Sequence, residues 1–170
     1  MTNFTTDIAI IGAGVIGLAI GRNLALKNKE ILILEALDGL GQITSSRNSG
    51  VIHAGIYYLE NSLKAKMCLK GNRLLYEYCK KYSIPHRNTK KILVATNHEQ
   101  VQIIDKIKLQ AEKNGVENIE NLSNLRVSKI EPLIKCKEGL LVPTSGIIDS
   151  ISFMNSLEWE IKEAEGKISY

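Results

Sequence analysis

The chain has 170 residues, of which 44% are hydrophobic, 24% charged and 5% aromatic, and its formal net charge is +4. This length and apolar content predict a folded globular chain rather than a disordered one. Lysines are interleaved with glutamates, so the positive charge favours a solvated surface over nucleic-acid binding. The three cysteines, Cys68, Cys79 and Cys136, have no CxxC spacing and leave one unpaired in any pairing. We therefore expect a reduced chain with a cytoplasmic location.

Residues 8–21 contain no charged side chain, a pattern also found in membrane spans and secretory signals. The run is shorter than the ~20 apolar residues that cross a bilayer. It follows Asp7 rather than a basic segment, and no small-residue cleavage site comes after it. We therefore expect neither a transmembrane segment nor a secretory signal here.

The first predicted strand, residues 7–11, leads into a glycine-rich turn and then into a helix over residues 15–28. Gly12, Gly14 and Gly17 have the spacing GxGxxG. In this pattern the first glycine allows a tight turn, the second leaves room for a pyrophosphate, and the third lets the helix pack on the strand. The helix N-terminus offers N–H groups and the positive end of its dipole. The sequence therefore predicts a dinucleotide-binding turn.

A second predicted strand, residues 30–34, is followed by Glu35, which lies 23 positions after Gly12. An acidic residue at this distance accepts hydrogen bonds from the adenosine ribose in dinucleotide-binding folds. The alternative is an ordinary strand, turn and helix whose glycines serve packing alone. Strand, glycine spacing, helix and acid all agree, which favours the dinucleotide site.

No second crossover helix is predicted after that strand. Residues 38–55 instead form a loop rich in glycine, serine and other small residues, with Arg47 and Asn48 among them. Such side chains suit a loop that closes over a diphosphate and a ring system, and a flexible surface loop is the alternative. The lack of a further βα unit argues against a NAD-dependent dehydrogenase.

The middle of the chain alternates between helix and strand patterns. An apolar stripe predicts a helix over residues 62–82, ended by Pro85. Short length and β-branched content predict a strand over residues 91–96. Asn97 and Gln100 resemble a capping box for a helix that ends at Gly115.

Residues 116–137 have a mixed pattern, with a short turn of helix ended by Pro132. Regular elements are predicted again in the last part of the chain. They are a strand over residues 139–143, a helix that Asp149 or Ser150 caps and Gly166 ends, and the start of a strand over residues 167–170.

Two long stretches resemble a known family. TSSRNSGVIHAGIYY, residues 44–58, and SLKAKMCLKGNRLLYEYC, residues 62–79, are similar to the L-2-hydroxyglutarate dehydrogenase/oxidase family of FAD-dependent oxidoreductases, in the D-amino-acid oxidase-like superfamily. The similarity continues through KILVAT, residues 91–96, and EGLLVPTSGIID, residues 138–149, and so covers nearly the whole chain. FAD-dependent glycerol-3-phosphate dehydrogenases and amine oxidases are more distantly similar.

The resemblance implies an α/β fold: a Rossmann-like FAD-binding domain interrupted by the start of an antiparallel-sheet substrate domain. Residues 1–85 would be the first FAD-binding segment, residues 86–143 a partial substrate-domain segment, and residues 144–170 a truncated return to the FAD-binding domain. The implied cofactor is FAD, and no metal is expected. The residues implied to contact FAD are Gly12, Ala13, Gly14, Val15, Ile16, Gly17, Glu35, Ser45, Ser46, Arg47, Asn48 and Ser49.

Members of this family are much longer than this chain, and their later part forms most of the substrate sheet and a segment that contacts the flavin. The resemblance therefore implies either the N-terminal part of a split or decayed gene, or a second polypeptide that supplies the missing half. Peripheral attachment to the inner face of a membrane stays open, because related enzymes can attach through parts that this chain lacks.

Oxidation of L-2-hydroxyglutarate to 2-oxoglutarate transfers a hydride from C2 to the flavin N5 while another group accepts the hydroxyl proton. His53 is the candidate base, because an imidazole titrates near neutral pH. Packing against the flavin and a covalent flavin link are the alternative roles of His53. Candidate substrate-binding side chains, chosen by proximity in sequence, are Arg47, Lys64, Lys66, Arg73, Tyr57 and Tyr58.

Two other functions stay open at this point. The chain is either a non-catalytic remnant that binds FAD weakly or not at all, or an FAD-dependent oxidoreductase acting on glycerol-3-phosphate or an amino acid. The stretches over residues 62–79 and 138–149 fit those substrates less well than L-2-hydroxyglutarate.

Overall fold

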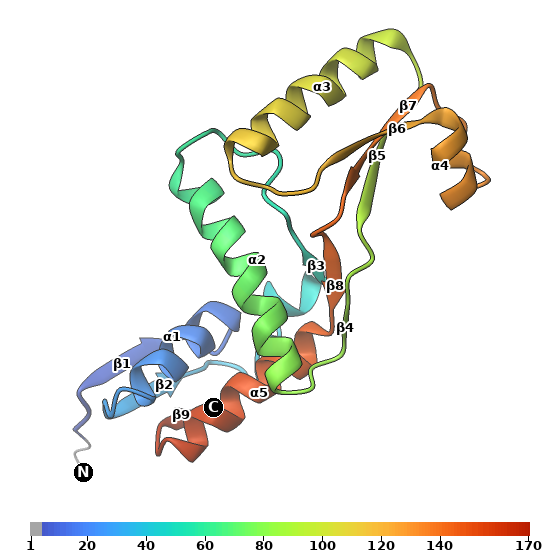
Figure 1. Ribbon diagram of the computed structural model, residues 1–170. Helices are drawn as coiled ribbons and strands as arrows, with labels where there is room; N and C mark the ends of the chain where they lie inside the picture. Colours follow the sequence, from blue (N-terminus) through green and yellow to red (C-terminus); the bar gives the residue numbers. More distant parts are fainter. Residues whose placement is uncertain (1–4) are drawn as a thin grey trace. The chain divides into compact units, whose positions relative to one another are not determined.

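The computed structural model describes residues 5–170, and the chain divides into two compact units (Figure 1). Unit 1 consists of Met1–Gly50, Tyr82–Pro85 and Asp149–Tyr170. Unit 2 consists of Val51–Lys81 and His86–Ile148. The resemblance implies a different division, into FAD-binding segments over residues 1–85 and 144–170 and a substrate-domain segment over residues 86–143, and this functional assignment stays a prediction.

Unit 1 is built on a parallel sheet of three strands in the order β1–β2–β9. The strands are β1 (Ile8–Ile11), β2 (Ile31–Leu34) and β9 (Lys167–Ser169). Ile10 lies beside Ile33, and Ile33 lies beside Ile168. Two helices, α1 (Val15–Ala25) and α5 (Ser150–Glu163), belong to this unit and pack on each other. The order places a βαβ connection, β1–α1–β2, at the start of the chain.

The two faces of this sheet differ in burial. Side chains alternate across a strand, and Ile31 and Ile33 of β2 are buried beneath the helices. A Cβ on Gly21 of α1 would lie only 2.7 Å from the Ile33 Cδ1 atom, so the helix packs closely on this face. Ile11 and Leu34 point to the opposite face and are 80% and 39% exposed. Parallel sheets are normally covered on both faces. In unit 1, no helix of the described residues covers the face of Ile11 and Leu34, and this apolar face is exposed.

A buried carboxylate ties the helices of unit 1 together. Glu160 of α5 is buried and accepts hydrogen bonds from the Arg22 guanidinium, with Nη2 at 2.9 Å from Oε1, and from the Tyr82 hydroxyl. Arg22 lies in the last turn of α1. The Arg22 Nε–H donates to the other carboxylate oxygen, Oε2. Because both carboxylate oxygens are bonded to a cation, the charge is tolerated in a buried position.

Unit 2 contains two antiparallel sheets of three strands each. The short strands β3 (Val51–Ile52), β8 (Gly146–Ile148) and β4 (His86–Arg87) form one sheet in the order β3–β8–β4. The other sheet has the order β5–β7–β6 and consists of β5 (Lys91–Ala95), β7 (Glu138–Val142) and β6 (Glu120–Ser123). The strands β3, β8 and β4 have only two or three residues each, and they form because β8 pairs with two segments far away in the sequence.

Three helices complete unit 2: α2 (Leu63–Lys81), α3 (His98–Lys113) and α4 (Asn124–Ile130). Buried Ala95, Ile104 and Leu140 form one core cluster where α3 covers the β5–β7 pair. A second cluster contains Ala54 and Ile56 beside Val142. The segment after β3 is therefore anchored in the core by its apolar side chains.

The α/β fold class predicted from the sequence is confirmed, and the longer predicted elements are present. Helix α1 ends at Ala25 instead of residue 28, because Asn28 has a φ of +58° and so lies outside helical geometry. The short helix before Pro132 begins at Asn124, where the Ser123 side chain accepts a hydrogen bond from the Arg126 N–H. Four short strands, β3, β4, β6 and β8, were not predicted. None of the helices over residues 5–170 combines the length and apolar character needed to span a bilayer.

Candidate functional site

The glycine turn of unit 1 brings α1 against the end of β1. Gly12 has a φ of +98°, a conformation that favours glycine, and its N–H donates to the Leu34 carbonyl at 2.7 Å. A Cβ on Gly17 would lie 2.0 Å from the Gly12 carbonyl oxygen. The turn therefore requires glycine at both positions, as the spacing predicted.

Glu35 comes directly after β2 and turns back toward this loop. Its Oε2 accepts from the Ala13 N–H at 2.7 Å, and its Oε1 accepts from the N–H groups of Ala36 and Leu37 at 2.9 and 3.1 Å. The pKa of Glu35 is lowered from its ordinary value, first by the Ala13 N–H and next by the Leu37 N–H, because these donors favour the charged form. A carboxylate thus lies at the edge of the glycine turn at neutral pH.

Ser45 approaches the same turn from the loop that follows β2. Its Oγ accepts from the Val15 N–H at 3.0 Å, which satisfies one donor in the first turn of α1. A cleft of about 180 Å³ opens between these groups. It is lined by Gly14, Glu35, Gly41, Gln42, Ile43, Thr44 and Ser45.

The cleft fits a diphosphate. A Cβ on Gly14 would lie 3.2 Å from the Ser45 Oγ atom, so the glycine keeps this approach to the helix N-terminus open. No acidic residue of α1 lies in its first turn, and the Glu35 carboxylate is bonded to the N–H groups of Ala13, Ala36 and Leu37, so the N–H groups of the first turn of α1 face no acid of their own helix. A hydroxyl and backbone N–H groups are suitable partners for phosphate oxygens.

The other predicted loop residues have a different role in the structure. The side chains of Ser46 and Arg47 donate to the Gln42 carbonyl, at 2.8 and 3.0 Å, and the Asn48 Oδ1 accepts from the Gly50 N–H at 2.6 Å. These side chains hold the loop in its own shape, and Ser49 is exposed. Ile16 follows Val15 in the first turn of α1, and its side chain is also exposed.

Four cleft residues, Gly41 to Thr44, were missed by sequence reasoning. The available signal was Gly41, which has a φ of +57° and whose N–H donates to the Ala13 carbonyl at 3.0 Å. A Cβ there would lie 2.6 Å from the Met154 sulfur. Gly41, in the loop after β2, is therefore the residue of that loop whose backbone N–H bonds to the glycine turn.

His53 belongs to unit 2 and follows directly after β3. Its side chain is exposed, whereas its neighbours Ile52 and Ala54 are buried. The buried neighbours fix the backbone, and the imidazole remains accessible. This arrangement suits a group that reacts with a ligand, and the role of His53 stays a prediction.

The candidate substrate cations of unit 2 lie on α2. The Lys64 Nζ atom lies 4.7 Å from the centroid of the Tyr58 ring, and Arg73 forms an ion pair with Glu117 at 3.0 Å. Tyr57 makes a cation–π contact with Lys91, whose Nζ atom lies 5.8 Å from the centroid of the Tyr57 ring. Most of these side chains therefore already have partners within unit 2.

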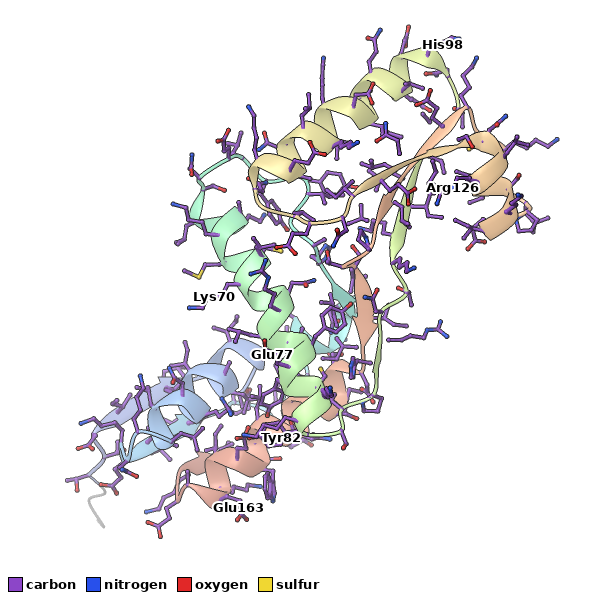
Figure 2. The ribbon with its side chains drawn as sticks, in the orientation of Figure 1. Lys70, Glu77, Tyr82, His98, Arg126 and Glu163 are labelled. Carbon is purple, nitrogen blue, oxygen red and sulfur yellow. The ribbon has the colours of Figure 1, made fainter. Side chains whose placement is uncertain are left out.

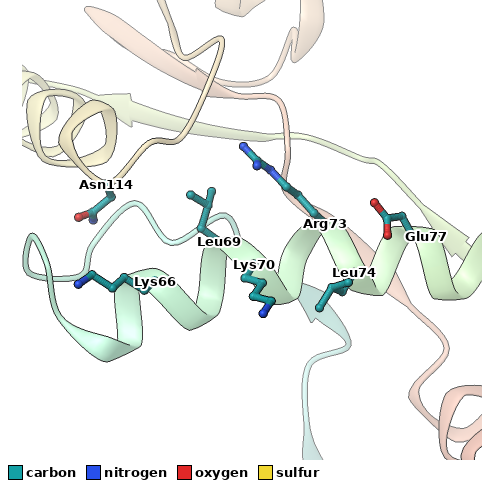
Figure 3. A pocket seen from close by; sticks show the side chains of 7 residues that line it. All are labelled: Lys66, Leu69, Lys70, Arg73, Leu74, Glu77 and Asn114. Carbon is teal, nitrogen blue, oxygen red and sulfur yellow. The ribbon is translucent and has the colours of Figure 1, made fainter. Parts of the chain in front are cut away.

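A hollow of about 410 Å³ lies along α2 and includes Lys66 (Figure 3). Its other lining residues are Leu69, Lys70, Arg73, Leu74, Glu77 and Asn114. Figure 2 labels Lys70 and Glu77 on this helix, where cation and acid lie along the same exposed surface. Three cations, Lys66, Lys70 and Arg73, and one acid, Glu77, line the hollow, so its lining carries a net positive charge, although Arg73 already pairs with Glu117.

Comparison with known proteins identifies the class. Residues 7–170 match the model of the family described as "DAO: FAD dependent oxidoreductase", so the chain belongs to this family. FAD is the cofactor of the family, and the glycine turn, Glu35 and Ser45 are suitable for it. Across residues 5–170, no group of three or more His, Cys, Asp or Glu side chains is placed to hold a metal ion.

Curated L-2-hydroxyglutarate dehydrogenases are similar to the chain, which confirms the resemblance found in the sequence. The relative from Arabidopsis thaliana is 47% identical over 151 residues, covering 89% of this chain and 31% of its own length. That from Dictyostelium discoideum is 41% identical, covering 96% of this chain and 37% of its own length. The chain thus spans about a third of the length of these relatives.

Among solved structures, the L-alpha-glycerophosphate oxidase from Mycoplasma pneumoniae with FAD bound superposes with a TM-score of 0.92 at 28% identity. The match covers 98% of this chain and 45% of that one. L-proline dehydrogenase from P. horikoshii, at 19% identity and a TM-score of 0.86, shares the fold. The comparisons give no support to a second polypeptide, which is one of the two possibilities that the resemblance implies.

The expected cytoplasmic location is wrong by these comparisons. The relatives from Arabidopsis thaliana, Dictyostelium discoideum and Homo sapiens are all named as mitochondrial enzymes. Unpaired cysteines indicate reducing surroundings, and they do not distinguish between the compartments that provide them. The cysteine pattern was therefore too weak a basis for a location.

The hydrogen bonds of Glu35 predict a pH dependence of stability. Because the folded-state pKa is below the ordinary value of 4.5, the carboxylate stabilises the fold above that value and the effect is lost as pH falls through the folded pKa. We expect Glu35→Gln to lower the urea midpoint at pH 7, and we expect this difference from the parent to shrink on acidification. Urea unfolding of both proteins from pH 7 down to pH 3 measures it.

The matched control is Glu163→Gln, at an exposed position at the end of α5. This change should leave the urea midpoint nearly unaltered across the same pH range. A Glu35→Gln difference that stays constant with pH would show that the charge of Glu35 contributes nothing through its N–H donors.

Proposed function

We propose that unit 1 binds FAD with its pyrophosphate at the N-terminus of α1. The supporting observation is that Glu35 and Ser45, from two different segments, accept hydrogen bonds from Ala13 and Val15 on either side of Gly14. On this proposal Glu35 also binds the adenosine ribose, and Ser45 donates its hydroxyl proton to a phosphate oxygen. The remaining predicted contacts, Ser46, Arg47, Asn48 and Ser49, would act by keeping the loop closed over the cofactor.

We expect Gly14→Ala to weaken FAD binding at least about tenfold, or ~1.4 kcal/mol, because the added methyl group occupies the approach of the pyrophosphate. The fold should tolerate the change, since only the Ser45 hydroxyl lies within 3.4 Å of the new Cβ. Titration of FAD, followed by quenching of flavin fluorescence, gives the two dissociation constants.

Gly71→Ala is the control, because a Cβ on this α2 glycine meets nothing within 4 Å. It should bind FAD as the parent does. Equal affinities for the parent and Gly14→Ala would contradict the proposed phosphate position, and a parent that binds NAD as tightly as FAD would contradict the choice of cofactor.

We further propose that the enzyme containing this segment oxidises L-2-hydroxyglutarate to 2-oxoglutarate. This proposal rests on the identity of 47% to the relative from Arabidopsis thaliana, which is higher than the 28% to the glycerophosphate oxidase. FAD supplies a ring that accepts the hydride from C2 with its two electrons. The hydroxyl proton leaves as the C2=O double bond forms, and the His53 imidazole accepts it. An exposed imidazole on a fixed backbone fits this role.

The role of His53 requires an active, full-length enzyme for its test. Residues 1–170 can replace the corresponding segment of the Arabidopsis thaliana relative, which is 47% identical over the 151 residues that align. In this chimera we expect His53→Asn to lower kcat for L-2-hydroxyglutarate by a factor of about 10² to 10⁴, the usual contribution of general acid–base catalysis. Steady-state kinetics under anaerobic conditions with an artificial acceptor measure it.

His98→Asn is the control, since this histidine lies at the start of α3 and its ring contacts the Lys137 Nζ atom at 3.0 Å. It should turn over as the parent does. Turnover of His53→Asn within a few-fold of the parent would exclude His53 as the base. A higher kcat/KM with glycerol 3-phosphate than with L-2-hydroxyglutarate would instead favour the activity named for the Mycoplasma pneumoniae neighbour.

A further inference from the structure

Asn72 is a buried polar residue in the middle of α2, and its side-chain amide bonds to segments outside the helix. It is 7% exposed. The Nδ2 group donates to the His53 carbonyl at 3.0 Å and to the Thr144 carbonyl at 2.9 Å. Both N–H bonds of the amide are therefore used, and each holds a different segment of unit 2.

The His53 carbonyl lies where the sheet no longer provides a partner. Strand β3 ends at Ile52, and its register with β8 includes only Val51 and Ile52. The Cys68 Sγ atom lies 3.6 Å from the same carbonyl oxygen. Two side chains of α2 thus take over the hydrogen bonding of the chain at the point where β3 stops.

The rest of this segment is held in a similar way. Asn114 donates through Nδ2 to the Gly55 and Tyr58 carbonyls, at 3.3 and 2.7 Å. Gly55 has a φ of +84°, so the backbone turns here and cannot continue as a strand. Between the carbonyls that the two asparagines hold, the side chains of Ala54 and Ile56 are buried in the core. Residues 53–58 form a loop whose backbone is fixed and whose imidazole is exposed.

We infer that Asn72 is a positioning residue for His53: its amide fixes the backbone from which the imidazole reaches the substrate. The inference rests on the proposed role of His53 as the base. General-base catalysis requires the base to lie within hydrogen-bond reach of the hydroxyl proton, and a displacement of about 1 Å can cost roughly a hundredfold in rate. The Asn72 amide is itself held by the Thr144 carbonyl, so a shift of the His53 backbone away from α2 would break the hydrogen bond from Asn72 to the His53 carbonyl.

The isosteric variant Asn72→Asp separates hydrogen bonding from packing. It keeps the shape of the side chain and replaces both N–H donors with a carboxylate oxygen. In the chain itself, we expect amide hydrogen exchange to become at least about tenfold faster in residues 51–58, where the backbone is held, and to stay unchanged in β1 and β2 of unit 1. Asn72→Ala lacks the buried charge and should give the same local pattern.

In the chimera, we expect Asn72→Asp to lower kcat for L-2-hydroxyglutarate roughly tenfold to a hundredfold, with KM within about threefold of the parent. A general loss of stability would instead reduce the amount of active enzyme, which flavin content reports, without lowering kcat per bound flavin. Asn121→Asp, at an exposed position on β6, is the matched control and should leave kcat and exchange unchanged.

The results distinguish the inference from the proposed function. If His53→Asn abolishes turnover while Asn72→Asp leaves kcat per flavin unchanged, or if exchange in residues 51–58 is unaltered, the positioning role is wrong and the base assignment stands. If His53→Asn turns over normally, the base assignment is wrong, and positioning of the base is excluded with it.

Discussion

The first turn of α1 lies so close to the end of β1 that the carbonyl of Gly12 occupies the space of a side chain at position 17. A Cβ on Gly17 would lie 2.0 Å from that oxygen. This contact sets the position at which the helix begins relative to the strand, and therefore where its N-terminal N–H groups point. The parallel pairing of β1 with β2 then brings Glu35 to the same edge, because the carboxyl ends of parallel strands meet there.

Glu35 and Ser45 extend this local geometry to the rest of unit 1. Glu35 accepts from the Ala13 N–H, and Ser45 accepts from the Val15 N–H, so residues 22 and 30 positions away hold the turn from both sides. The same groups are suited to ribose and phosphate, which means that cofactor binding would replace or extend hydrogen bonds that already keep the loop in place. In unit 2, Asn72 and Asn114 hold the loop of His53 by its carbonyls in a comparable manner.

The sequence was sufficient for features that depend on local chemistry, namely the glycine turn, the acid after β2 and the long helices. It was insufficient where pairing is long-range. Strand β8 pairs with Val51–Ile52 and His86–Arg87, segments of two residues whose conformation depends on a partner far along the chain. Strand β6 is polar, with the sequence ENLS, and is a strand because it pairs with β7. Ser46, Arg47 and Asn48 have the right chemistry for a ligand, but their side chains bond to their own loop and, for Asn48, also to Ser150 of α5, which composition alone does not reveal.

Binding of FAD with its pyrophosphate at the glycine turn of unit 1 is the proposal on which the other functional proposals depend. The most direct measurement is an NMR titration of the ¹⁵N-labelled chain with FAD, compared with riboflavin, which lacks the diphosphate and adenosine. We expect FAD to shift the backbone amide signals of residues 12–17, Glu35 and residues 41–45, and riboflavin to leave them unchanged. Equal shifts with both ligands, or shifts from FAD that avoid the glycine turn, would contradict the proposal.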